Sequence, residues 1–285
     1  MLSEETKGLK LEDKFGRPDQ KFGLGHLHPI SQAILEIQEI FAGMGFHVAE
    51  GPELETEFYN FDVLNMPDDH PARDMQDTFW IKNPENFQFP ISNFQTNSKS
   101  QIPNSKKEAK SERPVLRTHT SGVQVRELEK GELPLRIIVP GKVFRNEATD
   151  ATHEVQFYQL EGLMVDKEVS LAHLKGVLTH FFEKFLGKDT GIRFRPSFFP
   201  FTEPSVEIDM RLIGTDAPEK LRGRWLEMMG AGMIHPNVLK NAAIDPNKYQ
   251  GFAFGGGIDR IAMLKWGIDD IRLMHSADLR FINQF

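Results

Sequence analysis

The sequence predicts an α+β domain built on an antiparallel β-sheet that is flanked by helices. Five strand-like segments lie within residues 135–234 with one helical segment among them, and strands joined in this way usually pair antiparallel. Three segments, residues 28–46, 170–187 and 259–267, carry apolar side chains at helical spacing. Helices of this kind need an apolar surface to cover, and the sheet would supply it.

Composition limits the class of protein to which the chain can belong. Its 285 residues with 39% hydrophobic content suffice for one large domain with appendages. It lacks an apolar run of about eighteen residues, and its charged start is unlike a secretory signal, so we expect no membrane partner and a cytoplasmic location. The absence of cysteine excludes disulfides and a cysteine nucleophile. A net charge of −7 argues against nucleic-acid binding by bulk electrostatics.

The first part of the chain predicts an extended lead-in, a helix, a short strand and an insertion. Residues 1–25 are polar and contain glycine, which suits the lead-in. Residues 28–46 begin near a proline suited to a first helical turn and end at two glycines, so their apolar period predicts a helix. Residues 47–55 suggest the short strand. Residues 94–114 are rich in Ser, Lys, Asn and Gln, and we expect them to be disordered.

The second part predicts the sheet and two further helices. The strand-like segments are residues 135–147, 155–166, 194–201, 205–214 and 224–234. Ser170 is suited to the cap of the helix in residues 170–187, and Gly187 to its end. A glycine run precedes the last amphipathic helix, which we place at residues 259–267.

Strand alternation gathers polar side chains in the first two strands of the sheet. Arg145 and Glu147 share one face of the first strand, and Phe157, Gln159 and Glu161 share one face of the second. If the two strands pair as a hairpin, the five side chains can form one recognition surface. An arginine fork suits a phosphate, and a phenylalanine ring can stack on a flat base. The alternative is an exposed sheet face with ordinary ion pairs.

Three shorter motifs are weaker signals when taken one at a time. Gly255–Gly257 open a helix that carries Arg260 in its first turn, where anions are favoured, although a glycine run is more often only a tight turn. Residues 117–124 place His119 and Ser121 together. Phe199 and Phe201 alternate onto one face beside Glu203, as a pocket lining or as core. The spacing of histidines and aspartates elsewhere fits no familiar metal site.

Taken together, these motifs resemble those of a known family. Residues 144–162, "FRNEATDATHEVQFYQLEG", resemble motif 2 of class II aminoacyl-tRNA synthetases, "GGGIDR" resembles motif 3, and residues 40–55 resemble motif 1. The segments "LRTHTSGVQ", "FFPFTEPSVE" and "GAGMIHPNVL" narrow the resemblance to the catalytic region of phenylalanyl-tRNA synthetase alpha subunits. It covers residues 26–285, which we expect to form the catalytic domain, apart from the insertion at 94–114.

The resemblance implies ATP-dependent activation of phenylalanine and its transfer to tRNA(Phe), with Mg²⁺ accompanying ATP and a beta subunit as partner in an alpha2beta2 assembly. The residues that would bind ATP are Arg145, Glu147, Phe157 and Arg260, and the two arginines would be catalytic. Those that would bind phenylalanine are His119, Ser121, Gln159, Glu161, Phe199, Phe201 and Ala253. Glu203 matches a magnesium ligand of the family.

The chain departs from the family pattern before His26, where the long helical arm that contacts tRNA in the family is expected to be missing. Two alternatives to the enzyme therefore stand beside it. One is a non-catalytic relative that binds ATP or tRNA fragments, against which the presence of Arg145, Glu147 and Arg260 argues. The other is an alpha chain that is inert until the beta subunit joins it.

Overall fold

A computed structural model of the chain describes residues 26–74, 77–82, 113–187, 189–214 and 222–285. The lead-in predicted at residues 1–25 lies outside the described residues. So does the insertion predicted at 94–114, as far as residue 112. The predicted end of the insertion is wrong by two residues. Arg113 is described, and Pro114 begins strand β3 (Pro114–Leu116) as a buried residue.

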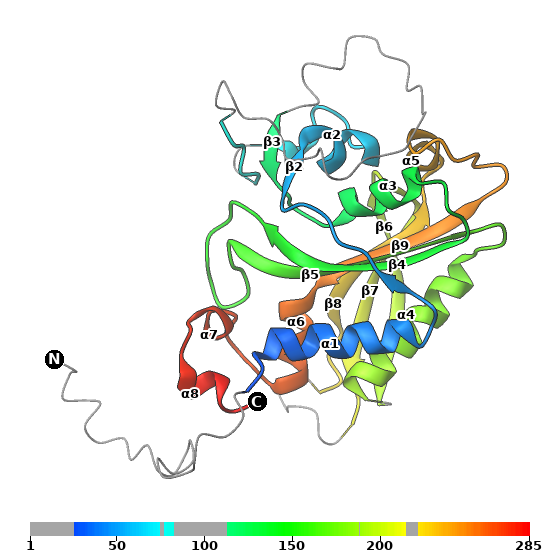
Figure 1. Cartoon of the computed structure of the whole chain (residues 1–285). Helices are drawn as coiled ribbons and strands as arrows, with labels where there is room; N and C mark the ends of the chain where they lie inside the picture. Colours follow the sequence, from blue (N-terminus) through cyan, green and yellow to red (C-terminus); the bar gives the residue numbers. More distant parts are fainter. Residues whose placement is uncertain (1–25, 75–76, 83–112, 188, 215–221) are drawn as a thin grey trace, which may run out of the picture.

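A seven-stranded sheet forms the centre of the molecule (Figure 1). Its strands, in spatial order, are β1 (His47–Val48), β4 (Leu135–Phe144), β5 (Gln156–Asp166), β9 (Gln250–Gly257), β8 (Leu226–Ile234), β7 (Thr202–Leu212) and β6 (Thr190–Phe199). All neighbours pair antiparallel except β1, which lies parallel to β4. The predicted antiparallel sheet is thus confirmed. The short strand predicted within residues 47–55 begins with β1, which joins the edge of the sheet in a parallel pairing that its sequence does not predict.

Three helices cover one face of the sheet: α1 (Pro29–Ala42), α4 (Leu171–Leu186) and α6 (Ile258–Trp266) (Figure 1). Their buried side chains join those of the strands in the larger of two hydrophobic clusters. Phe41 lies at its centre, with its ring 5.1 Å from that of Phe181 and 5.5 Å from that of Phe254. Much of the phenylalanine-rich composition is therefore used in this layer, where large apolar rings bury the most area.

The other face carries a smaller layer of short elements, which packs on the second hydrophobic cluster (Figure 1). The layer contains β2 (Leu54–Thr56), α2 (Glu57–Asn60), η3 (Asp62–Leu64), η4 (Pro71–Arg73), β3, α3 (Ser121–Glu129) and α5 (Pro236–Asn241). β2 and β3 form a separate antiparallel pair. Because this layer covers only part of its face of the sheet, the strands beneath it can contribute side chains to a cleft.

The helix ends follow from local chemistry. At the start of α1, the His28 Nδ1 accepts a hydrogen bond from the Ile30 N–H at 3.2 Å, and Pro29 occupies the first turn. At α4, Ser170 and His173 form a reciprocal capping box, and Gly187 ends the helix with φ 101°. The predictions of these helices and their caps are confirmed.

Two predictions for the last third of the chain are wrong. The glycine run before α6 belongs to strand β9 instead of a turn, and α6 is followed by α7 (Arg272–His275) and α8 (Leu279–Ile282). Helix α3 was also not expected. A strand rich in glycine has too few apolar side chains to show a period of two, so the pattern alone could not identify it. No helix in the described part of the chain has the length and apolar character needed to cross a membrane.

Two glycine-to-alanine substitutions should change the stability of the protein in opposite directions, because one glycine is crowded and the other is not. A Cβ added at Gly162 would lie 2.0 Å from the Phe254 Cζ, so Gly162→Ala should lower the free energy of unfolding by about 1–3 kcal/mol. Gly176, exposed within α4, meets nothing within 4 Å, so Gly176→Ala should raise it by about 0.5–1 kcal/mol. Urea unfolding of both variants checks the pair, and equal shifts would contradict it.

Candidate active site

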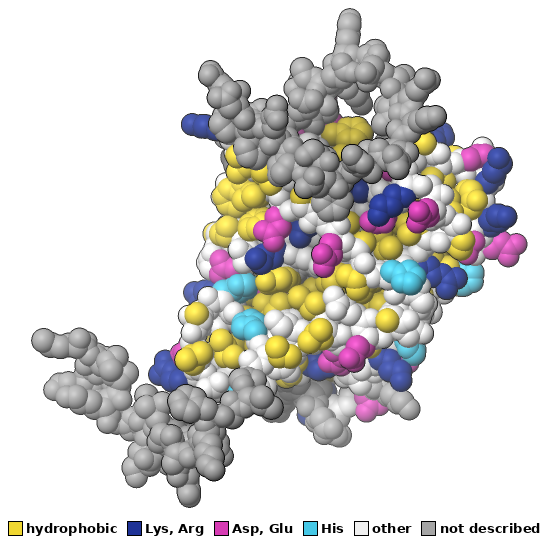
Figure 2. All heavy atoms as spheres, viewed as in Figure 1, with side chains coloured by type: hydrophobic (Ala, Val, Ile, Leu, Met, Phe, Trp, Pro, Cys, Tyr) yellow, Lys and Arg dark blue, Asp and Glu magenta, His cyan; other side chains and the backbone are white. Residues whose placement is uncertain are grey.

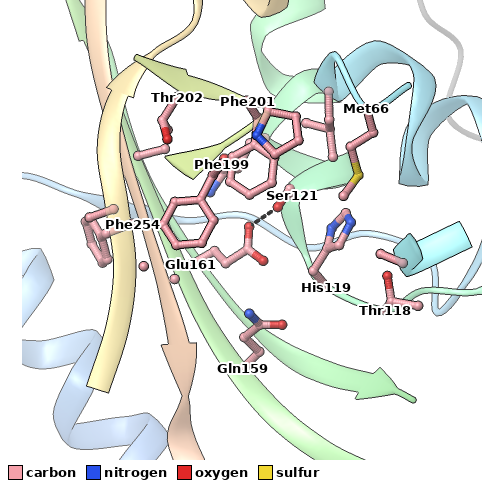
Figure 3. Close-up of a pocket in the computed structure, with 18 of the residues that line it drawn as sticks. Met66, Thr118, His119, Ser121, Gln159, Glu161, Phe199, Phe201, Thr202 and Phe254 are labelled. Carbon is pink, nitrogen blue, oxygen red and sulfur yellow. Dashed lines mark hydrogen bonds between the residues drawn. The ribbon is translucent and has the colours of Figure 1, made fainter. Parts of the chain in front are cut away.

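A cleft of about 650 Å³ opens on the face of the sheet that the small layer covers. Nine of the residues predicted from sequence line it: His119, Ser121, Arg145, Glu147, Gln159, Glu161, Phe199, Phe201 and Ala253. Figure 3 shows several of them pointing toward one another from the β5 strand, the start of α3 and the β6–β7 turn. Phe157, Arg260 and Glu203 do not line the cleft and are considered separately below.

The register of β4 and β5 explains the polar floor of the cleft. Val143 lies opposite Phe157, Gly141 opposite Gln159, and Val139 opposite Glu161. Side chains at such paired positions point to the same face, so the hairpin prediction that Gln159 and Glu161 share a surface is confirmed.

Arg145 follows β4 directly and extends the same surface. Its guanidinium carbon lies 5.1 Å from the centroid of the Phe157 ring. Phe157 therefore contacts a cleft residue, although it does not line the cleft itself. The Arg145 Nε donates a hydrogen bond to the Thr118 carbonyl oxygen at 3.3 Å. Partial burial lowers the pKa of Arg145, and the carboxylates of Glu147, Glu161 and Asp77 oppose that shift. A cation held in this way suits a negatively charged ligand.

Glu161 is a buried carboxyl group at the centre of the cleft, with 4% of its surface exposed. It accepts hydrogen bonds from the Thr120 N–H at 3.1 Å and from the Ser121 hydroxyl at 2.5 Å, and the second is drawn in Figure 3. Burial raises its pKa to about 7, although these two hydrogen bonds and the nearby Arg145 and Arg117 favour the ionised form. Near neutral pH this carboxyl group is therefore only about half ionised, and a ligand cation at this point would favour its ionised form.

His119 stands beside Glu161 on the segment that leads into α3. Neither ring nitrogen has a hydrogen-bond partner, and its ring meets that of Phe61 edge to face at 6.5 Å. Burial, assisted by the positive charge of Arg145, lowers the pKa of His119 to about 4. His119 is therefore a neutral hydrogen-bonding group near neutral pH, not a cation.

Several buried polar atoms on one side of the cleft have no hydrogen-bond partner. Beside the two nitrogens of His119 they include the Gln159 Oε1 and the Gln124 Nε2. Buried polar atoms nearly always have partners, so a group of them facing one cleft points to a ligand. Gln124 was not among the predicted site residues. Gln124 lies one helical turn after Ser121, so the two residues share a face of α3. The sequence pattern did not predict α3 and so could not relate the two residues.

The opposite end of the cleft is apolar and flat. Phe199 and Phe201 lie with centroids 5.8 Å apart and planes 9° from parallel. A Cβ at Gly230 would lie 2.8 Å from the Phe199 Cζ, so the ring rests directly on the β8 backbone. Ala253 from β9 faces the same space with a single methyl group. An unsubstituted aromatic ring is the ligand group that fits such walls.

Acidic and basic side chains border the third part of the cleft, where β6, β7 and β8 meet. The Arg195 guanidinium lies 2.8 Å from Glu207 and 3.4 Å from Glu227, and it also holds Asp209 at 2.6 Å. The Arg260 Nε donates to the Glu227 carbonyl oxygen at 3.1 Å, which places Arg260 at this rim. Glu207 and Glu227 line the cleft but were not predicted, because they become neighbours only through strand pairing.

Glu203 lies away from the cleft lining. Its carboxylate is largely exposed and forms an ion pair with the His235 Nε2 at 3.3 Å. Among the residues that the structure describes, no group of three or more His, Asp or Glu side chains is arranged to hold a metal ion. The expected magnesium role of Glu203 therefore stays a prediction.

The molecular surface, seen in the view of Figure 1, is mixed in character. Figure 2 shows hydrophobic side chains gathered across the middle of this face, with acidic, basic and histidine side chains around them. Leu27, just before α1, and Leu35 within it remain 55% and 48% exposed. Hydrophobic side chains that gather on one face, as in Figure 2, are typical of protein contact surfaces.

Comparison with known proteins relates the chain to a synthetase family. Residues 14–285 match the family model described as tRNA synthetases class II core domain (F). Phenylalanine–tRNA ligase alpha subunits from Caldanaerobacter subterraneus and Bacillus subtilis are 47% and 49% identical to the chain. The first match covers 99% of the chain and 76% of the relative, and the second covers 94% and 71%.

Solved structures agree on the fold. Two structures of pyrrolysyl-tRNA synthetase from Desulfitobacterium hafniense match with TM-scores of 0.56 and 0.58 at 17% identity. They cover 86% and 88% of the chain, and 70% and 74% of the matched chains. At this identity the likeness supports the predicted sheet architecture and nothing finer.

The neutral state of His119 predicts a loss of stability in acid. Unfolding returns its pKa from about 4 toward 6.5, so between these values the unfolded chain binds more protons and stability falls as pH falls. The free energy of unfolding of the wild type relative to His119→Asn should drop by about 2 kcal/mol from about pH 7 to about pH 5. Urea titrations of both proteins test this, and a pH-independent difference would contradict it.

Proposed function

The chain belongs to the family of phenylalanine–tRNA ligase alpha subunits, with a class II tRNA synthetase core, and we propose that it activates phenylalanine with ATP and transfers it to the terminal ribose of tRNA(Phe). One observation carries the proposal. A single cleft joins unpaired polar groups around Glu161 to a flat apolar end at Phe199 and Phe201. Those two ends suit the two ends of phenylalanine.

The polar end would hold the backbone part of the amino acid. The substrate ammonium would donate to the Glu161 carboxylate, which the Ser121 hydroxyl and Thr120 N–H already orient. The Gln159 Oε1 would accept a second ammonium proton, since it is buried without a partner. Neutral His119 and Gln124 supply further hydrogen-bonding atoms at the same place. These contacts fix the amino acid without adding positive charge that would repel its ammonium group.

The apolar end would hold the phenylalanine ring. Phe199, Phe201 and Ala253 form its walls, and a small residue at 253 leaves room for the ring. Exclusion of tyrosine by an apolar pocket that meets a single hydroxyl is modest, about a hundredfold.

The nucleotide would lie along the rim that runs from Arg145 to Arg260. Arg145 would bind the α-phosphate, Glu147 would face the adenine amino group, and Phe157 would stack on the base. The contact between the Arg145 guanidinium and the Phe157 ring supports this placement, because a base on that ring would bring the α-phosphate near Arg145. Arg260 would hold the terminal phosphate from its place beside Glu227.

The chemistry needs no nucleophile from the protein. The phenylalanine carboxylate attacks the α-phosphorus of ATP, the bond to the β-phosphate oxygen breaks, and pyrophosphate leaves. A ribose hydroxyl of tRNA then attacks the carbonyl carbon of the adenylate, and AMP leaves. The chain contributes position and positive charge: Glu161 orients the amino acid while Arg145 offsets the charge that develops on phosphorus.

Two carboxylates of the third part of the cleft are candidates for binding magnesium, in addition to Glu203. Glu207 and Glu227 line the cleft beside Arg260, and carboxylates that share a site with phosphates are usual magnesium ligands. Magnesium, when bound, would neutralise phosphate charge. Arg195 lies on the same two carboxylates, so it would act as their counter-ion before the metal binds.

A beta subunit, an alpha2beta2 assembly and a cytoplasmic location stay predictions. The names of the relatives as alpha subunits support a partner chain. The exposed Leu27 and Leu35 offer apolar contacts for it. An alpha chain inert until its partner joins is compatible with this proposal, whereas a non-catalytic relative has no need of both motif arginines.

Phenylalanine-dependent exchange of pyrophosphate into ATP tests the proposed function directly. With its beta partner the chain should catalyse the exchange, and Arg145→Gln or Arg260→Gln should each reduce the rate by about a hundredfold or more, because each removes charge stabilisation from the phosphates. Arg136→Gln is the matched control. Arg136 lies on β4 at an odd spacing from Arg145, so it points to the other face. Absence of exchange with the partner present would contradict the proposal.

The size of residue 253 should set the selectivity for the ring. Ala253→Gly removes a methyl group from the ring pocket and should improve the use of para-substituted phenylalanines about tenfold relative to phenylalanine. Ala253→Val should do the reverse and weaken phenylalanine itself. Exchange rates with phenylalanine and with a para-chloro analogue measure both variants. Unchanged selectivity in the two would place residue 253 outside the ring pocket.

A further inference from the structure

Arg117 is a buried arginine whose hydrogen bonds all go to backbone. It is 6% exposed, and its Nε donates to the Lys142 carbonyl oxygen at 2.7 Å. Its Nη1 donates to the carbonyl oxygens of Gly51 and Pro52 at 3.0 and 3.2 Å. The guanidinium therefore joins three separate parts of the chain: the turn before β2, strand β4, and the segment that leads to His119.

A buried cation without a carboxylate partner is costly. Each of the three acceptors described for Arg117 is a neutral carbonyl, which solvates the guanidinium but leaves its charge uncompensated. Burial accordingly lowers the pKa of Arg117, opposed by the more distant carboxylates of Glu53, Glu161 and Glu55. A neutral side chain with several donors could link the three segments equally well. The positive charge of Arg117 therefore needs a separate explanation.

The position of the guanidinium supplies that role. A Cβ added at Gly141 would lie 2.5 Å from the Arg117 Nη2, so the guanidinium sits directly over Gly141. Gly141 is opposite Gln159, and the next position on the same face of β4, Val139, is opposite Glu161. Arg117 thus lies on the face of the sheet that carries Glu161, above a residue pair that neighbours the pair containing Glu161.

The segment between the two groups is held from both ends. The Thr120 hydroxyl donates to the Val139 carbonyl oxygen at 3.0 Å, and the Thr120 N–H donates to the Glu161 carboxylate. Asn60 clamps the preceding residue, Thr118, through two hydrogen bonds of 3.0 and 3.2 Å. Movement of Arg117 would therefore reach Glu161 through a short and rigid connection.

We propose that Arg117 is a positioning residue of the amino-acid site, whose buried positive charge favours the ionised form of the Glu161 carboxylate while its fork fixes the His119–Ser121 segment against the sheet. The value of this for binding a substrate ammonium rests on the proposed function. The effect on Glu161 itself does not.

Of the other groups that face Glu161, only Arg145 also supplies positive charge. It acts from the position that follows β4. His119 is neutral at working pH, and Ser121 and Thr120 donate hydrogen bonds without net charge. On the β9 side Gly255 has no side chain, and Glu207 of β7, which lines the same cleft, is itself negative and is paired with Arg195. Arg117 is thus the second of two cations that favour the ionised carboxylate.

An infrared titration of the ligand-free protein, with its beta partner, tests the proposal. The carbonyl band of protonated Glu161 is identified as the band that Glu161→Gln removes, and its intensity is followed against pH. Arg117→Gln keeps donors for the carbonyls but removes the charge, and should raise the midpoint of the titration by about one pH unit. Arg117→Lys keeps the charge and loses the fork, and should leave the midpoint within a few tenths of a unit of wild type while lowering the melting temperature.

The outcomes separate a charge role from a purely structural one. An unchanged midpoint in folded Arg117→Gln would overturn the proposal, whatever its melting temperature. If that variant does not fold, Arg117→Lys decides: a midpoint displaced by a full unit although the charge is kept would overturn it, and an unchanged midpoint supports it. Because the titration uses no substrate, it stays informative even if phenylalanine fails to bind, a result that would count against the proposed function alone.

Discussion

The buried carboxyl group of Glu161 is the constraint on which the rest of the cleft depends. It lies on the central part of the sheet at 4% exposure, where an ionised group needs donors and positive charge around it. Thr120 and Ser121 supply the donors, so the start of α3 must lie against β5. Arg117 and Arg145 supply the charge, so the segment before α3 and the end of β4 must converge there as well.

The two faces of the sheet divide the work of the molecule. One face meets α1, α4 and α6 through a continuous apolar layer with Phe41, Phe181 and Phe254 near its centre, and this layer gives the strands a fixed register. The other face needs that rigidity, because it presents polar side chains whose positions depend on which residues are paired across strands. The smaller layer of short elements leaves part of its face of the sheet uncovered. There the strands that carry the core on one face form the floor of the cleft on the other.

Sequence reasoning reached those parts of the site that follow from local periodicity. Alternation along β4 and β5 places Gln159 and Glu161 on one surface, and their register confirms it. It could not identify Glu207 and Glu227, which meet only through pairing of β7 with β8 and through the shared Arg195. The glycine-rich β9 also escaped notice, since its lack of side chains erases the pattern by which strands are recognised. The roles of individual residues came from family resemblance, not from periodicity.

The floor of the cleft is defined in part by side chains that are absent. Gly230 lies beneath the Phe199 ring, and a Cβ at Gly255 would come within 2.9 Å of the Glu161 Cγ. The ring wall and the central carboxylate thus keep their positions only because two hydrogen atoms stand where methyl groups would otherwise be. A mutational survey that truncates side chains to alanine has nothing to remove at such places. The shape of this site can be mapped fully only by substitutions that add atoms to it.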